Sequence, residues 1–102
     1  MSEALKLLEA ERERKAALRD SYKRQLDDLG TKRDILQEQM KRLKEDMDKL
    51  KPPSPILQKE YDKLVLRDQG LTADQQRVRA DMNRTAKDIQ TLGGQIKQLG
   101  GE

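Results

Sequence analysis

The side chains that most often carry chemistry in proteins are absent from this chain or dispersed along it. The 102 residues include no His and no Cys, so neither an imidazole base nor a thiolate nucleophile can form. The remaining acid–base groups are carboxylates and amines. Pairs such as Glu45 and Lys49 have the i,i+4 spacing of solvated contacts on a helix surface. We therefore predict no enzymatic activity, no cofactor, no metal site and no small-molecule substrate.

Ser54 matches a modification signal, because a Ser followed by Pro is typical of proline-directed phosphorylation. The surrounding segment, residues 51–55 (Lys-Pro-Pro-Ser-Pro), also has the composition of a polyproline ligand. The same residues have a structural explanation. Proline interrupts a helix, and Ser54 followed by Pro55 suits the N-cap and first position of a new one. We favour the helix break with a cap over either binding signal.

The spacing of the few apolar residues predicts the secondary structure that positions the charged and polar side chains. Only 33% of the residues are hydrophobic and 40% are charged, which is typical either of disorder or of long coiled helices. Between residues 22 and 50, steps of alternately four and three residues form the heptad of a coiled coil, and eight of nine such positions are apolar. The a and d positions of this first helix are Tyr22, Leu26, Leu29, Arg33, Leu36, Met40, Leu43, Met47 and Leu50.

The second half of the chain repeats this pattern, with ten of thirteen positions apolar. Its a and d positions are Leu57, Tyr61, Leu64, Asp68, Leu71, Gln75, Val78, Met82, Thr85, Ile89, Leu92, Ile96 and Leu99. We name the a and d residues of both halves the seam. Apart from Gln75 and Thr85, we predict that the seam is the coiled-coil interface of the protein.

The chain divides into five predicted segments. They are a charged helical extension over 1–21, the heptad part of the first helix over 22–50, a Pro-rich linker over 51–54, a second helix over 55–99 and a tail over 100–102. The predicted fold class is all-α, an antiparallel coiled-coil hairpin, because four residues commonly join antiparallel helices. Two alternatives remain: a parallel two-stranded rod, whose heptad phase survives the prolines, and a three-helix arrangement broken at Gly70.

Two charged seam residues favour the hairpin over the rod. A parallel dimer in register would place Arg33 against Arg33 and Asp68 against Asp68 at a positions, where like charges are costly. In the hairpin, Leu36 lies opposite Asp68 and Arg33 opposite Leu71. We therefore predict an ion pair between Arg33 and Asp68 across adjacent layers.

Upstream of Tyr22 the seam becomes polar. The register places Arg12, Lys15 and Arg19 on it, and Leu18 reaches the seam only if a four-residue stutter is inserted. We expect loose packing there.

Two of the six glycines, Gly30 and Gly70, are candidate interruptions. We expect Gly30 and Gly70 to be weak points within continuous helices, and the pairs Gly93-Gly94 and Gly100-Gly101 to loosen the last turns of the second helix.

The charges are interleaved rather than segregated. Residues 1–50 carry thirteen Lys or Arg and twelve Asp or Glu, so we expect neither a basic arm nor a signal peptide in this half. We consider direct nucleic-acid binding and membrane insertion improbable. Zero cysteine fits a reducing compartment, so we expect a cytoplasmic location, with the nucleus as the alternative.

These features predict a non-enzymatic coiled-coil structural or adaptor subunit whose partners are proteins, either further copies of itself or the helices of another subunit. A lone two-helix hairpin buries little apolar surface against the entropy of ordering its chain, so we expect it to associate with further helices. The alternative is a small helical chaperone or binding module for a cytoskeletal client. The size and charge are similar to those of tubulin-cofactor-like bundles, an analogy of architecture with no shared motif.

Overall fold

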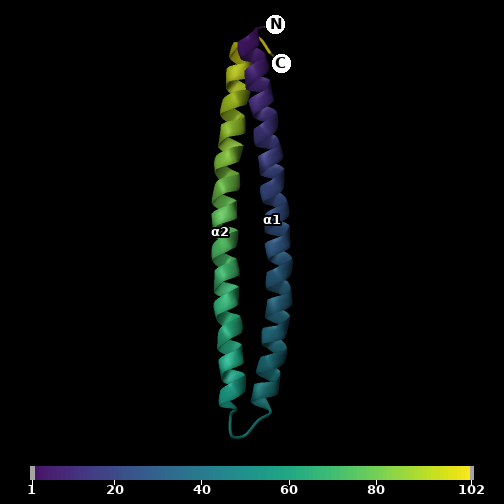
Figure 1. The fold of residues 1–102 in the computed structure, drawn as a ribbon, viewed down its shortest axis with the longest axis vertical. Coiled ribbons are helices and arrows are strands. Elements are labelled where there is room, and N and C mark those ends of the chain that lie inside the picture. Colours follow the sequence, from purple (N-terminus) through teal and green to yellow (C-terminus); the bar gives the residue numbers. More distant parts are fainter. Residues whose placement is uncertain (1, 102) are drawn as a thin grey trace. The chain divides into compact units, whose positions relative to one another are not determined.

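The computed structural model describes residues 2–101. Met1 and Glu102, at the outer ends of the predicted extension and tail, lie outside the described residues. Two helices account for most of the chain: α1, Glu3–Asp48, and α2, Pro55–Gln98 (Figure 1). Residues 2–101 contain no strand. The all-α prediction is confirmed.

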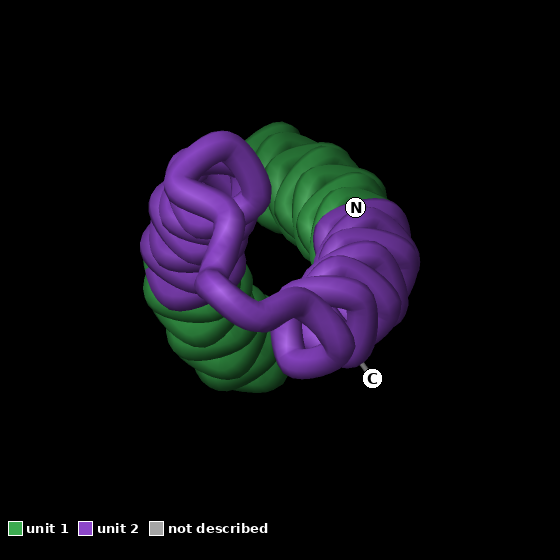
Figure 2. Tube along the Cα trace, turned by 90° about the horizontal axis from the view of Figure 1, so that it is seen from below, with its two compact units in different colours: residues 1–26, 77–102 green, residues 27–76 purple. Residues whose placement is uncertain are grey.

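The helices belong to two compact units, which Figure 2 colours separately. Unit 1 comprises Met1–Leu26 and Arg77–Glu102, and unit 2 comprises Asp27–Gln76. In each unit a segment of α1 packs against a segment of α2 that runs in the opposite direction, so the predicted antiparallel coiled-coil hairpin is confirmed.

Side-chain caps determine where both helices begin. The Ser2 hydroxyl accepts a hydrogen bond from the Leu5 amide at 3.1 Å, and the Ser54 hydroxyl accepts one from the Leu57 amide at 3.3 Å. Each bond satisfies one of the amides that a helix N-terminus leaves without an intrahelical partner. The predicted N-cap at Ser54, followed by Pro55 at the first helical position, is confirmed. The cap at Ser2 was not predicted.

α1 ends two residues earlier than predicted. The amides of Lys49 and Leu50 donate to the carbonyls of Asp46 and Met47, which tightens the last turn from i→i+4 to i→i+3 bonding. The chain then passes through Lys51–Ser54, in which the Lys51–Pro52 peptide bond is cis. The linker therefore begins sooner than the heptad pattern alone indicates.

Gly100 and Gly101 terminate α2 with a defined cap, contrary to the loosening expected there. The Gly101 amide donates to the Ile96 carbonyl and the Gly100 amide to the Lys97 carbonyl, both at 3.0 Å. Gly100 has a φ of 84°. This pair of bonds around a left-handed residue is a Schellman motif, which satisfies carbonyls at the helix C-terminus. The expectation was wrong because glycine weakens a helix interior but favours the turn that ends it.

Gly30 and Gly70 lie inside continuous helices, as predicted, and the three-helix alternative broken at Gly70 is wrong. No atom of another residue lies within 4 Å of the position that a Cβ would take at either glycine, after exclusion of chain neighbours and the helix's own nearby backbone. Neither glycine is therefore required by a close approach of the helices.

Candidate functional site

The seam residues of unit 2 lie between its two helical segments. Leu36 is buried, with 3% of its surface exposed. The other seam residues here that are at least half-buried are Leu29, Arg33, Met40, Leu43, Met47, Leu57, Tyr61, Leu64, Asp68, Leu71 and Gln75. The antiparallel register explains this pattern, because it pairs each a position of α1 with a d position of α2.

Unit 1 has more fully buried seam residues. Val78, Thr85 and Ile96 are buried, as is Leu5. The half-buried members of the predicted seam in this unit are Tyr22, Leu26, Met82, Ile89 and Leu92. Thr85 keeps its buried hydroxyl satisfied by donating to the Asp81 carbonyl at 2.9 Å, so a polar seam position carries no unmet hydrogen bond.

Two predicted interface residues do not belong to it. Leu50 is 43% exposed and Leu99 is 47% exposed. Both lie just beyond the last helical residue, Asp48 and Gln98 respectively, so neither is held in the helical geometry that would direct it to the seam. At the C-terminal end, Gly101 lies against Ile96 and Leu5: a Cβ built on it would lie 2.7 Å from Ile96 Cγ2 and 2.9 Å from Leu5 Cδ1.

A polar cluster occupies the middle of the seam in unit 2. Arg33 Nε donates to Asp68 Oδ1 at 2.9 Å and Arg33 Nη2 to Asp68 Oδ2 at 3.4 Å, while Nη1 donates to Gln75 Oε1 at 3.0 Å. The predicted ion pair between Arg33 and Asp68 is confirmed. The role of Gln75 as a second acceptor was missed, although its a position one heptad after Asp68 carried the signal.

The cluster is half-buried rather than enclosed, with the Arg33 side chain 27% and the Asp68 side chain 20% exposed. The hydrogen bond to Asp68 raises the pKa of Arg33, and the nearby charges of Asp68 and Asp34 act in the same direction against partial desolvation. The guanidinium therefore stays charged. It has no proton to exchange at ordinary pH, so the cluster is suited to orientation and not to acid–base chemistry.

The polar N-terminal part of the seam in unit 1 keeps its heptad phase. Arg12, Lys15 and Arg19 are half-buried, whereas Leu18 is 38% exposed. The heptad of residues 22–50 therefore continues upstream without the stutter that would be needed to bring Leu18 to the seam. Lys15 Nζ forms an ion pair with Asp88 Oδ2 at 3.3 Å across the two helical segments, a contact that sequence reasoning missed. The pair fixes the end of a Lys that extends along the seam from a d position.

Arg19 carries a buried Nε atom with no hydrogen-bond partner among the described residues. Buried polar atoms in native proteins are nearly always paired, and leaving one unpaired is costly. This stretch of unit 1 is accordingly less favourable for the isolated chain than an apolar seam would be.

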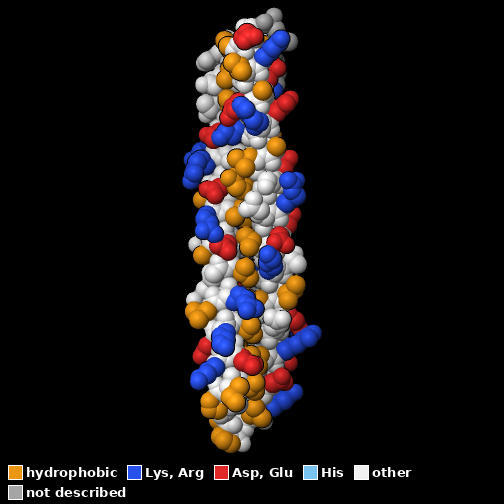
Figure 3. Space-filling model, in the orientation of Figure 1, with side chains coloured by type: hydrophobic (Ala, Val, Ile, Leu, Met, Phe, Trp, Pro, Cys, Tyr) orange, Lys and Arg blue, Asp and Glu red, His pale blue; other side chains and the backbone are white. Residues whose placement is uncertain are grey.

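Large apolar side chains also lie outside the seam. Ile35 is 57%, Ile56 71% and Leu66 67% exposed in unit 2, and Leu7 is 67% exposed in unit 1. On the face drawn in Figure 3, Lys and Arg are interspersed with Asp and Glu, and apolar side chains are visible between them. The helix surface is thus charged in both signs but interrupted by apolar positions.

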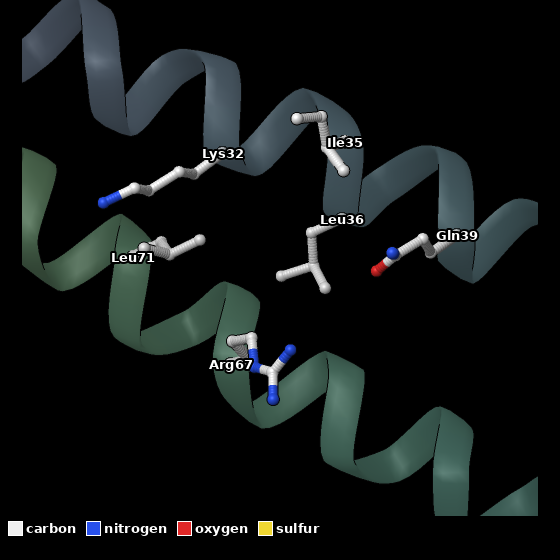
Figure 4. Close-up of a pocket in the computed structure, with 6 residues that line it drawn as sticks. All are labelled: Lys32, Ile35, Leu36, Gln39, Arg67 and Leu71. Carbon is white, nitrogen blue, oxygen red and sulfur yellow. The ribbon is translucent and has the colours of Figure 1, made fainter.

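Beside the seam of unit 2 is a groove lined by both helices. Its first part, of about 270 Å³, is lined by Lys32, Ile35, Leu36, Gln39, Arg67 and Leu71 (Figure 4). Leu36 and Leu71 point from opposite helices into the space between them, and Lys32 extends from α1 toward α2. The second part, of about 290 Å³, is lined by Gln39, Leu43, Glu60, Lys63, Leu64 and Arg67. Gln39 and Arg67 line both parts, so the two are continuous.

The described residues offer no arrangement for metal or membrane chemistry. No group of three or more Asp or Glu side chains in residues 2–101 is placed to hold a metal ion. Neither α1 nor α2 contains a stretch long and apolar enough to cross a bilayer. The features that the described residues do form are a half-open seam, a polar cluster and an apolar groove.

Comparison of the chain with protein-family models, with curated proteins and with solved structures finds no match.

Proposed function

We propose that the protein is a non-enzymatic coiled-coil structural or adaptor subunit, which holds other protein chains together through its helices. The observation that carries the proposal is the incomplete burial of the seam. Among residues 2–101, the apolar residues that are buried are Leu5, Leu36, Val78 and Ile96, and of these only Ile96 is fully buried. In a pair of helices, each seam residue is covered by the facing helix but stays open to solvent along both edges of the seam. The apolar surface at these edges is available to further helices.

The energetics of the chain support association. Ordering a residue costs roughly 1.5 kcal/mol, and across helices of 46 and 44 residues most seam side chains give only part of the stabilisation of full burial, because they are half-buried. The exposed positions of Ile35, Ile56, Leu66 and Leu7 add apolar surface that the intramolecular pairing leaves uncovered. Association with other helices would bury this surface and the outer sides of the seam residues.

The fold and composition also support the proposals for class and location. A reducing compartment, the cytoplasm or alternatively the nucleus, is consistent with the absence of cysteine. The interleaved charges favour protein partners over nucleic acid, because phosphate recognition needs concentrated positive charge. The cytoskeleton is the setting we consider first, since long helical subunits are common there.

The groove in unit 2 supports a second candidate function, a small chaperone or binding module for one client. Its apolar floor is open in the isolated chain, as a site that binds and releases a segment requires. Release distinguishes the two functions. A structural subunit stays in stoichiometric complex through purification, whereas a chaperone dissociates from its folded client.

Sedimentation equilibrium combined with circular dichroism tests the proposed association. We expect helicity and sedimenting mass to increase together with protein concentration or on addition of a copurified partner. The Leu43→Asp variant places a charge on the half-buried seam and should lose both. Lys44→Asp, at the adjacent exposed position, is the matched control and should retain both. A monomer with complete, heat-stable helicity at all concentrations would disprove the proposal.

A further inference from the structure

We propose that the groove of unit 2 binds an amphipathic partner helix with acidic residues beside its apolar stripe. This inference rests on the proposed function and specifies the partner of one surface. The floor of the groove is apolar: Leu36 and Leu43 come from α1, and Leu64 and Leu71 come from α2. These residues alternate between the helices and would contact successive turns of a helix lying between them.

The charged side chains that line the groove determine which residues are favoured beside the apolar stripe of a partner helix. Lys32, Lys63 and Arg67 line it, against one carboxylate, Glu60. Lys32 already forms an exposed i,i+4 ion pair with Asp28 at 3.1 Å. Lys63 and Arg67 have no ion-pair partner among residues 2–101, so their charges are available to an incoming carboxylate. Opposite charge at a groove edge favours Asp or Glu on the occupant and disfavours Lys or Arg.

Ile35 extends the apolar surface beyond the seam. It lines the first part of the groove and is 57% exposed, so the pairing of α1 with α2 leaves more than half of its surface open. An isoleucine at an exposed helix position is ordinary when isolated. Here it adjoins an apolar floor, so its side chain would be covered by the same helix that fills the groove.

The length of the groove sets the length of its occupant. Its lining spans residues 32–43 of α1 and 60–71 of α2, and twelve helical residues extend on the order of 18 Å. A partner helix of about three turns would cover this distance and present apolar side chains at i, i+3 or i+4, and i+7.

A second copy of the chain is a poorer occupant than an acidic helix. A two-fold dimer uses the same surface on both subunits, so the groove of one copy would face the groove of the other. Each groove is lined by Lys32, Lys63 and Arg67 against the single carboxylate of Glu60, so two facing grooves would hold an excess of positive charge. Repulsion between like charges opposes that arrangement, whereas an acidic helix neutralises them.

Binding of designed helical peptides to the full chain tests the inference. The acidic probe is a dye-labelled peptide of about 18 residues with Leu at the a and d positions and Glu at the flanking e and g positions. The basic probe replaces each Glu with Lys, and a third probe keeps the Glu residues but replaces each Leu with Gln. Fluorescence anisotropy should give at least about tenfold tighter binding of the acidic probe than of either other probe.

Charge reversal locates the binding surface. The double variant Lys63→Glu with Arg67→Glu should weaken the acidic probe by about tenfold or more and strengthen the basic probe. Lys41→Glu with Lys44→Glu makes the same change at exposed α1 positions that do not line the groove, and should leave both affinities within about twofold. Ile35→Ser should weaken binding of the acidic probe, whereas Leu66→Ser should not, because Leu66 is also apolar and exposed, at 67%, but does not line the groove. Circular dichroism of every variant separates lost binding from lost folding.

The outcomes distinguish this inference from the proposed function. Equal binding of the acidic and basic probes, or of the acidic probe and its Leu-free counterpart, would overturn the acidic-helix inference. The inference would also be overturned if the chain does not bind the acidic probe but self-associates, and if Ile35→Ser abolishes that self-association. The occupant of the groove would then be a second copy of the chain. In that last case the proposed assembly function stands. A chain that binds none of the probes would overturn the acidic-helix inference alone, because the proposed function is decided by the sedimentation and circular-dichroism test described above.

Discussion

Arg33 on α1 holds Asp68 on α2 with two nitrogen atoms of its guanidinium group, at 2.9 and 3.4 Å, from a seam position that would ordinarily be apolar. The guanidinium plane matches the two carboxylate oxygens, which gives the contact a defined geometry as well as a charge. The same side chain reaches Gln75 with its third nitrogen. One residue of α1 therefore specifies which part of α2 it must face.

A charge-exchange experiment should reveal the coupling between these residues. We expect Arg33→Asp and Asp68→Arg each to lower the melting temperature, because each leaves like charges on a half-buried seam. The variant with both changes should recover part of the loss. Melting followed by circular dichroism provides the double-mutant cycle, and losses that simply add would contradict direct coupling.

The stabilisation that the charge of Arg33 gives to the pair should not change with pH between neutral and moderately alkaline conditions. The pKa of Arg33 is raised in the folded chain, so its stabilising charge is fully present below the ordinary arginine pKa and disappears only as the pH rises above the raised value. Melting temperatures of the native chain and Arg33→Gln should therefore differ by a constant amount between neutral pH and about pH 10. A difference that falls over this range would assign the stabilisation to another group.

Leu36→Ala should be the most destabilising single truncation in unit 2. Leu36 is 3% exposed, and replacing a buried leucine with alanine typically costs about 2–5 kcal/mol, with less expected here because solvent is near on both sides of the seam. Ile35→Ala is the matched control. The Ile35 side chain is next to Leu36 in the sequence but 57% exposed, so its truncation should change the free energy of unfolding by less than about 1 kcal/mol. Urea denaturation measures both. Equal effects would show that the seam is assigned to the wrong face.

Gly94 within α2 and Gly100 just after its end should respond to alanine substitution with opposite signs. Gly100→Ala places a side chain at a φ of 84° and should cost about 1–2 kcal/mol, although nothing lies within 4 Å of the added carbon. Gly94→Ala acts within the helix, where no neighbour obstructs the new methyl group, and should stabilise by about 1 kcal/mol. Thermal denaturation of the two variants side by side tests the cap. Stabilisation by both would mean that α2 continues through Gly100.

Replacing Ser54, the N-cap of α2, with alanine should lower the stability of the chain, whereas replacing it with aspartate should not. Ser54→Ala removes the acceptor of the Leu57 amide and should cost about 1 kcal/mol, whereas Ser54→Asp keeps an acceptor and adds a negative charge at a helix N-terminus. Ser21→Ala, within α1, is the control and should have little effect. The comparison also indicates what phosphorylation would do: a phosphate at Ser54 should preserve the helix start rather than melt it.

The sequence predicts the helices and their register because both depend on repeating features. The heptad places Leu36 and Leu71 on the seam, and Arg33 and Asp68 fix which turns meet. The ends of the helices depend on single hydrogen bonds, so Leu50 and Leu99 were assigned to the interface although α1 and α2 end before them. A count of apolar positions carries no information about such local bonds.

The groove could not be predicted in the same way. Its residues come from two helices and from both seam and flanking heptad positions, and only the three-dimensional pairing brings Lys32 and Ile35 beside Arg67. The contact between Lys15 and Asp88 was missed for the same reason, since each alone resembles an ordinary surface charge. These features emerge from pairing and not from either helix.

The polar cluster of unit 2 also bears on the uniqueness of the folded state. Because leucines recur every seven residues, sliding α2 by one heptad would again place apolar side chains against apolar side chains. In one such alignment Arg33 would meet Asp68 and Tyr61, and in the other Gln75 and Met82. Only the observed alignment offers it both of its acceptors. Arg33, Asp68 and Gln75 therefore create an energy gap between otherwise nearly degenerate alignments, so that the hairpin has one ground state where its leucines alone would allow several.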